Sequence, residues 1–157
     1  MKCELWWIGK TNTSYLKDGI NIYTKRLTKY TNFEIKELTD QKNAKHLSTD
    51  ELKNKEGKDI LKRLEPKDHV ILLDEAGTSY TSIKFAKYIE KIQSASYTKV
   101  IFIIGGAYGF SESVYQRANG KIALSPMTFS HQMVRLIFTE QFYRAFSIIN
   151  NEPYHHQ

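Results

Sequence analysis

The chain has 157 residues, 41% of them hydrophobic and 13% aromatic, which favours one folded domain over residues 1–157 and excludes a disordered chain. Its formal net charge of +6 is a mild basic excess that fits an RNA partner and fits a lysine-rich solvated surface equally well. The single cysteine, Cys3, excludes an internal disulfide, and no apolar run has the length of a signal-peptide core or a membrane span, so we expect a cytoplasmic protein without membrane contact.

The first half of the chain predicts two strands and two helices. Thr13 or Ser14 can cap the first helix, and Pro66 ends the second, whose thin apolar face indicates that most of it is solvated. In chain order we predict a strand at 2–8, a helix to about residue 29, a weakly alternating strand at 33–38, a polar loop at 39–48 and a helix from Ser48 to about residue 64.

The second half predicts a parallel α/β arrangement. Residues 69–73 and 99–104 are nearly unbroken apolar runs, which are typical of strands buried on both faces of a parallel sheet. The remaining predicted elements are a turn at 74–77, a helix at 80–93, a short helix at 111–118, a strand at 121–125 and a long helix from Ser130 or His131 to residue 149. We therefore expect an α/β fold with a parallel sheet and helices on both of its faces.

The last helix is apolar on most of its sides, which indicates that it is buried on most sides. In a chain of this size the second cover is expected to be another subunit, with Phe138 and Phe142 as candidate contacts in a homodimer. The alternative is a central helix that lies wholly inside one domain.

A glycine-rich turn follows the strand at 99–104. Its residues 105–109 match neither the dinucleotide-binding fingerprint nor a P-loop, and a tight strand–helix turn is the commoner meaning of such a segment. Glycine also lets a ligand approach the main chain, so we expect a bulky residue at Gly105 to fill the space that a cofactor needs. Asp74 and Glu75 end another strand, where they could meet a ribose or a sulfonium, although a simple turn is the plainer reading of Glu75.

Charged and histidine residues of the last helix and the tail give weaker signals. His131 and Arg135 are one helical turn apart, and Glu140 and Arg144 have the same spacing, which favours a structural salt bridge for the second pair. The tail histidines lack partners at the spacing of a zinc site, so we expect no metal.

Four motifs together resemble one family. They are Ile-Gly-Gly-x-x-Gly at 104–109, Leu-Ser-x-Met-Thr-Phe-x-His-Gln-Met-x-Arg at 124–135, Glu-Gln-x-Tyr-Arg-Ala at 140–145 and Tyr-His-His at 154–156. This order resembles the ribosomal RNA large subunit methyltransferase H family, the pseudouridine N3-methyltransferases of 23S rRNA within the SPOUT superfamily. Ser130 departs from the family pattern, in which proline is usual at this position.

The resemblance implies a fold, a cofactor and a substrate. It implies a trefoil-knotted α/β fold, an obligate homodimer, S-adenosyl-L-methionine (S-adenosylmethionine) as methyl donor, and N3 of a pseudouridine in helix 69 of 23S rRNA in the ribosome as acceptor. The positions that would bind the cofactor are Leu73, Gly105, Leu124, Ser125, Pro126, Met127, Thr128 and Phe129. Backbone groups and apolar side chains of this kind suit an adenine and a methionine chain.

The resemblance also names residues for the reaction. Tyr154 or His155 could help to remove the N3 proton or hold the base, and we expect the tail to fold over the cofactor pocket. His131 and Arg135 could hold the loop or meet phosphate.

Two other functions stay open at this stage. One is a non-catalytic ribosome-binding assembly factor with a vestigial pocket, which calorimetric titration with S-adenosylmethionine would separate from an enzyme. The other is a SPOUT relative that methylates a ribose hydroxyl in transfer RNA, which mass spectrometry of the product would recognise.

Overall fold

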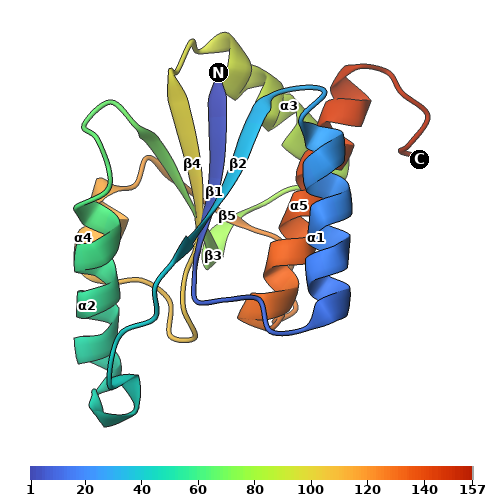
Figure 1. Ribbon diagram of the computed structural model, residues 1–157. Coiled ribbons are helices and arrows are strands. Elements are labelled where there is room, and N and C mark those ends of the chain that lie inside the picture. The colour runs from blue at the N-terminus through green and yellow to red at the C-terminus, as the bar shows by residue number, and fades with distance from the viewer. Residues whose placement is uncertain (157) are drawn as a thin grey trace.

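The five predicted strands form one sheet in which every pairing is parallel (Figure 1). The computed structural model describes residues 1–156. The strands are β1 (Lys2–Ile8), β2 (Asn32–Leu38), β3 (His69–Ser79), β4 (Lys99–Ile104) and β5 (Gly120–Ala123), in the order β2-β1-β4-β3-β5. The central position of β1, β4 and β3 explains their apolar runs, because both faces of these strands are covered.

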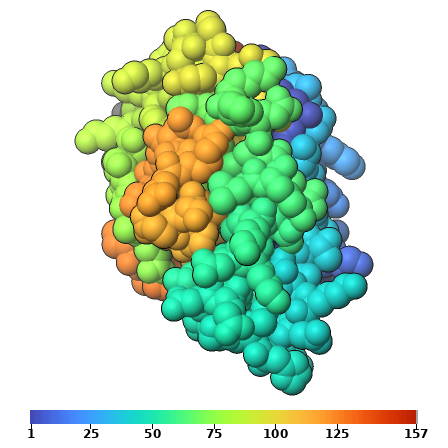
Figure 2. Space-filling view, turned by 90° about the vertical axis from the view of Figure 1, so that its left-hand side faces the viewer, coloured from blue at the N-terminus to red at the C-terminus, as the bar shows by residue number. Residues whose placement is uncertain are grey.

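Helices cover both faces of the sheet, as the sequence predicts (Figure 1). One face packs against α1 (Ser14–Leu27), α3 (Ser82–Ser94) and α5 (His131–Ile149), and the other against α2 (Thr49–Leu61) and α4 (Glu112–Arg117). Figure 2 looks onto the second face, at whose foot the short 3-10 turn η1 (Ala44–His46) protrudes. The α/β class with a parallel sheet is therefore confirmed, while the trefoil knot stays a prediction.

The sequence places several helix starts correctly because the capping residues act locally. The hydroxyl of Ser48 accepts a hydrogen bond from the backbone N–H of Glu51 at 3.2 Å, and Ser130 accepts one from Met133 at 3.2 Å. Each bond satisfies an N–H group that has no partner inside the helix. The predicted starts of α2 and α5 follow from these caps, whereas α2 ends at Leu61, earlier than the predicted residue 64.

One predicted turn is wrong. Residues 74–77 belong to β3, which continues to Ser79 and pairs with β5 on both sides of a bulge, since Leu73 and Thr78 both lie opposite Ile122. A Cβ atom on Gly77 would lie 2.6 Å from the backbone of Ile122, so only glycine permits this approach. The bulge pushes Asp74 and its neighbours out at the carboxyl edge of the sheet.

The prediction that Phe138 and Phe142 contact a second subunit is also wrong. Both side chains are fully buried inside one chain, with their ring centroids 4.9 and 5.3 Å from that of Phe102 on β4. Other apolar residues of α5 are only partly buried. Val134, Leu136, Tyr143, Ile148 and Ile149 still pack against this chain's core, whereas Met133 and Ile137 do not belong to that cluster. The inner side of α5 thus completes this chain's own core, and its outer side is open to further packing.

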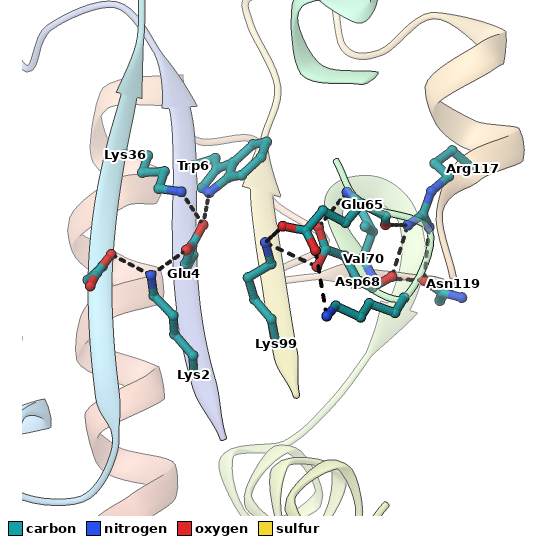
Figure 3. Close-up of polar contacts among 12 residues, drawn as sticks. Lys2, Glu4, Trp6, Lys36, Glu65, Asp68, Val70, Lys99, Arg117 and Asn119 are labelled. Carbon is teal, nitrogen blue, oxygen red and sulfur yellow. Dashed lines mark hydrogen bonds and ion pairs between the residues drawn. The ribbon is translucent and has the colours of Figure 1, made fainter. Parts of the chain in front are cut away.

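Ion pairs occupy the amino end of the sheet (Figure 3). Glu4 is 1% exposed, and its carboxylate pairs with Lys2 at 3.0 Å and Lys36 at 2.9 Å and accepts a hydrogen bond from Trp6 Nε1 at 2.7 Å. Burial raises the pKa of Glu4, but these hydrogen bonds outweigh it and hold the pKa below its usual value. The amino end is thus engaged in structural contacts, and the carboxyl end carries the cavities described next.

Candidate functional site

A cavity of about 630 Å³ opens at the carboxyl ends of β3 and β4, beside the start of α5. Its walls are three segments that are far apart in the sequence, residues 73–76, 104–110 and 128–131, together with Tyr115 and Val134. Because parallel strands end at one edge of the sheet, the sequence alone could place these segments near one another. A volume of this size fits a small-molecule ligand.

The predicted cofactor residues gather in and around this cavity. Leu73, Gly105, Thr128 and Phe129 line it. Two adjoining hollows of about 80 and 210 Å³ continue along the loop, and both contain Leu124 and Ser125, the smaller one also Met127. Pro126 is exposed in the same loop, and Met127 is 75% exposed, so the loop presents apolar surface at the mouth of the cavity.

Side chains of the protein itself lie close behind the glycine turn. A Cβ on Gly105 would lie 3.1 Å from Phe110 Cζ, and one on Gly106 would lie 2.7 Å from Glu56 Oε2. The expectation that a side chain at Gly105 fills the cofactor space directly therefore needs correction. It would press on Phe110, which itself lines the cavity, so the effect on a ligand would be indirect.

Asp74 is held in the cavity wall by a tyrosine that sequence reasoning missed. Its Oδ1 accepts a hydrogen bond from the backbone N–H of Ala76 at 2.8 Å, and its Oδ2 accepts one from the Tyr115 hydroxyl. Burial and this carboxylate together raise the pKa of Tyr115 to about 12, so the phenol stays protonated and keeps the carboxylate in place. The place of Tyr115 in the helix after the glycine turn was the only sequence signal for it.

A second cavity, of about 430 Å³, opens where β1 and β2 end. Its lining residues are Ile8, Gly9, Lys10, Asn12, Glu37, Leu38, Thr39, Asp40, His131 and Gln132. Gln132 fixes one wall, since its side chain accepts a hydrogen bond from the Asn12 N–H and donates one to the Lys10 carbonyl, both at 3.1 Å. His131 lines both cavities.

Arg135 lies one turn further along α5 and points into the protein. It is 1% exposed, donates hydrogen bonds to the Ile8 carbonyl at 2.8 Å and the Thr11 hydroxyl at 2.9 Å, and lies over the Trp7 ring at 4.9 Å. This buried position does not suit contact with phosphate, and the segment that Arg135 holds is residues 8–11 rather than the loop at 124–129. The guanidinium braces the segment after β1 that walls the second cavity.

The tail folds back beside the second half of α5. The Tyr154 hydroxyl donates to Glu140 Oε1 at 2.9 Å, and His155 Nδ1 lies 3.2 Å from Arg144 Nη1. The predicted salt bridge between Glu140 and Arg144 is present. The 19 residues of α5 span about 28 Å.

In one chain the tail therefore does not fold over the cavity, and that expectation needs correction. Figure 1 shows the end of α5 and the segment that follows it far from the glycine turn after β4. The four predicted catalytic residues form two groups, His131 with Arg135 near the cavities and Tyr154 with His155 away from them. Gln157 lies outside the described residues.

Two further observations concern residues 1–156. Within this range, no group of three or more His, Cys, Asp or Glu side chains is placed to hold a metal ion. None of the helices described here is both long enough and apolar enough to span a membrane.

Comparison with known proteins extends the resemblance to the whole chain. A family described as "Predicted SPOUT methyltransferase" matches residues 1–155. The chain is 57% identical to the ribosomal RNA large subunit methyltransferase H of Cytophaga hutchinsonii, over 99% of this chain and all of the relative. It is 53% identical to the protein of that name from Parabacteroides distasonis and 47% identical to that from Bacteroides thetaiotaomicron, over the full length of both chains in each pair.

Proposed function

Since the chain belongs to the SPOUT methyltransferase family, we propose that it methylates ribosomal RNA, at N3 of a pseudouridine in helix 69 of 23S rRNA, with S-adenosylmethionine as donor. The observation that carries the proposal is the cavity at the carboxyl edge, where Leu73, Gly105 and the loop at 124–129 meet. Full-length relatives named ribosomal RNA large subunit methyltransferase H support the RNA class of the substrate. The proposal places the protein in the cytoplasm, with the ribosome.

The residues present fit the proposed cofactor. The apolar loop at 124–129 and the open backbone at Gly105 suit an adenine and a methionine chain, and the cavity has the size of a ligand site. Asp74 and Glu75 put negative charge on the wall, which favours a ligand that carries a positive sulfonium and an amino group. When bound, S-adenosylmethionine supplies a methyl group attached to a positively charged sulfur. The sulfur is neutral once the methyl group has been transferred.

The work of this chain in the reaction is positioning and proton removal. Methylation forms a bond from N3 to the methyl carbon and requires that the N3 proton leaves, so the base must be held in line and next to a proton acceptor. The loop with Met127 and Phe129 supplies apolar surface that excludes water near the reacting atoms.

We further propose that the protein acts as a homodimer. Tyr154 and His155 lie beside Glu140 and Arg144, and neither side chain lines the two cavities described above, so we infer that they serve a cavity of a second copy. The half-buried outer side of α5 offers the apolar surface for such an association. In this arrangement the tail holds the target base.

The decisive experiment is to map the methylated nucleoside in ribosomes from cells with and without this protein. We expect N3-methylpseudouridine to disappear from helix 69 when the protein is absent and to return when purified protein and S-adenosylmethionine are added. A ribose methyl group in transfer RNA would support the SPOUT tRNA alternative. Calorimetry that detects no binding of S-adenosylmethionine would support the assembly-factor alternative.

A further inference from the structure

The second cavity, at the ends of β1 and β2, shares one lining residue with the cavity at the ends of β3 and β4. The latter is the proposed site of the methyl donor and is called the donor cavity below. Of the residues that line the two cavities, only His131, the first residue of α5, is common to both. A transfer between two molecules needs two sites that meet where the bond forms. The shared wall at His131 is such a meeting point.

The chemistry of the second cavity suits a nucleobase better than a phosphate. Glu37 and Asp40 offer two carboxylates against the single ammonium of Lys10, so the lining is negative on balance and repels a phosphate. Pseudouridine carries two N–H donors, N1–H and N3–H, and carboxylates accept such bonds. Asn12 and Lys10 can donate to its two carbonyl oxygens.

We propose, resting on the function proposed above, that this second cavity receives the target pseudouridine and that His131 accepts its N3 proton. The step balances as follows. The N3–C bond forms while the S–C bond breaks, its electron pair stays on sulfur, and the N3 proton passes to an imidazole nitrogen of His131 and later to water. The tail of a second copy holds the base and does not need to take its proton.

The surroundings of His131 keep its imidazole ready to accept a proton. Partial burial lowers its pKa, as does the positive charge of Arg135 on the same helix, while Asp40 acts in the opposite direction. Lys10 and Glu37 are the other charged side chains that line the second cavity, and Asp74 and Glu75 line the first cavity, which His131 also borders. A neutral imidazole at neutral pH is the form that can act as a base.

The test compares His131→Gln with wild-type protein on ribosomes that carry the pseudouridine, and follows kcat against pH. We expect a loss of about 100-fold or more in kcat near neutral pH, the usual size for removal of a general base. The defect should shrink as the pH rises, because the imide then loses its proton to solvent. kcat is compared at saturating S-adenosylmethionine, since His131 also lines the donor cavity. His46→Gln, at an exposed histidine of η1 outside both cavities, is the matched control.

A second arm tests the base cavity itself. Asp40→Asn and Asn12→Leu should raise KM for ribosomes and leave the affinity for S-adenosylmethionine as it is. Unchanged KM in both variants would overturn the cavity assignment. A His131→Gln protein with wild-type kcat, or with a loss that is equal at every pH, would overturn the assignment of the proton. Wild-type protein that forms no N3 product would instead remove the proposed function itself.

Discussion

Replacing Arg135 by methionine separates a structural from a catalytic role for this residue. The substitution removes the donors to the Ile8 carbonyl and the Thr11 hydroxyl and the positive charge over the Trp7 ring. Methionine keeps much of the buried volume, so the cavity left behind is small. The Ile8 carbonyl then loses its donor at the end of β1.

The magnitude follows from these contacts. A hydrogen bond from a charged donor contributes about 1.5–3 kcal/mol, and the contact with the ring about 0.5–2 kcal/mol. Against this, the buried guanidinium loses hydration, which also lowers its pKa, and its Nε has no hydrogen-bond partner among the described residues. We therefore expect a net loss of about 2–4 kcal/mol in the free energy of unfolding, or roughly 4–16 °C in Tm for a chain of this size.

The measurement is urea unfolding followed by tryptophan fluorescence, with Arg63→Met as the control at an exposed arginine. The control should change the free energy of unfolding by less than about 0.5 kcal/mol. Thr11→Val should lose about 1.5–3 kcal/mol, the contribution of one hydrogen bond from a charged donor, while the bond from Arg135 to the Ile8 carbonyl remains. If Arg135→Met keeps wild-type stability and loses methyl transfer, the bracing role is refuted and the residue acts in the reaction.

Three other changes test the site and its assembly. Gly105→Val should weaken S-adenosylmethionine binding in a protein that still folds, because the new side chain presses on Phe110 in the cavity wall. A calorimetric affinity for S-adenosylmethionine equal to that of the wild-type protein would contradict this prediction. Deletion of residues 154–157 should leave the chain folded and stop methyl transfer. Mixing this protein with Gly105→Val should restore activity, since one protein contributes an intact cavity and the other an intact tail. If dimers shown by sedimentation to be mixed stay inactive, the two copies do not share a site. Burial, and to a smaller extent Asp40, raise the pKa of Glu56 from 4.5 to about 7. The folded state therefore binds this proton more tightly than the unfolded state. The stabilisation of the folded state by protonated Glu56 is fully present below pH 4.5 and is lost as the pH rises through 7. Glu56→Gln should therefore stabilise the protein by about 1–2 kcal/mol above pH 7, after allowance for solvent screening, and change little below pH 4.5; equal urea midpoints for the two proteins at both pH values would contradict it.

The sequence by itself determined the elements and the edge of the sheet at which the site lies. Apolar runs at 69–73 and 99–104 predict buried parallel strands, and Ser48 and Ser130 predict helix starts, because these signals act between residues that are close in the chain. Parallel strands end at one edge, so the sequence places Leu73 and Gly105 at the same edge, while the pairing of β3 with β4 in the structure makes them neighbours.

Only the tertiary structure decided which partner covers each surface. The period of α5 shows that Phe138 is buried, but the same pattern arises whether the cover is β4 of the same chain or a second subunit. Likewise, His131 and Arg135 lie on the same face of α5, yet His131 lines two cavities and Arg135 is buried against β1. These outcomes depend on contacts between residues far apart in the chain, such as Phe102 with Phe138 and Arg135 with Ile8 and Thr11, which local periodicity does not encode.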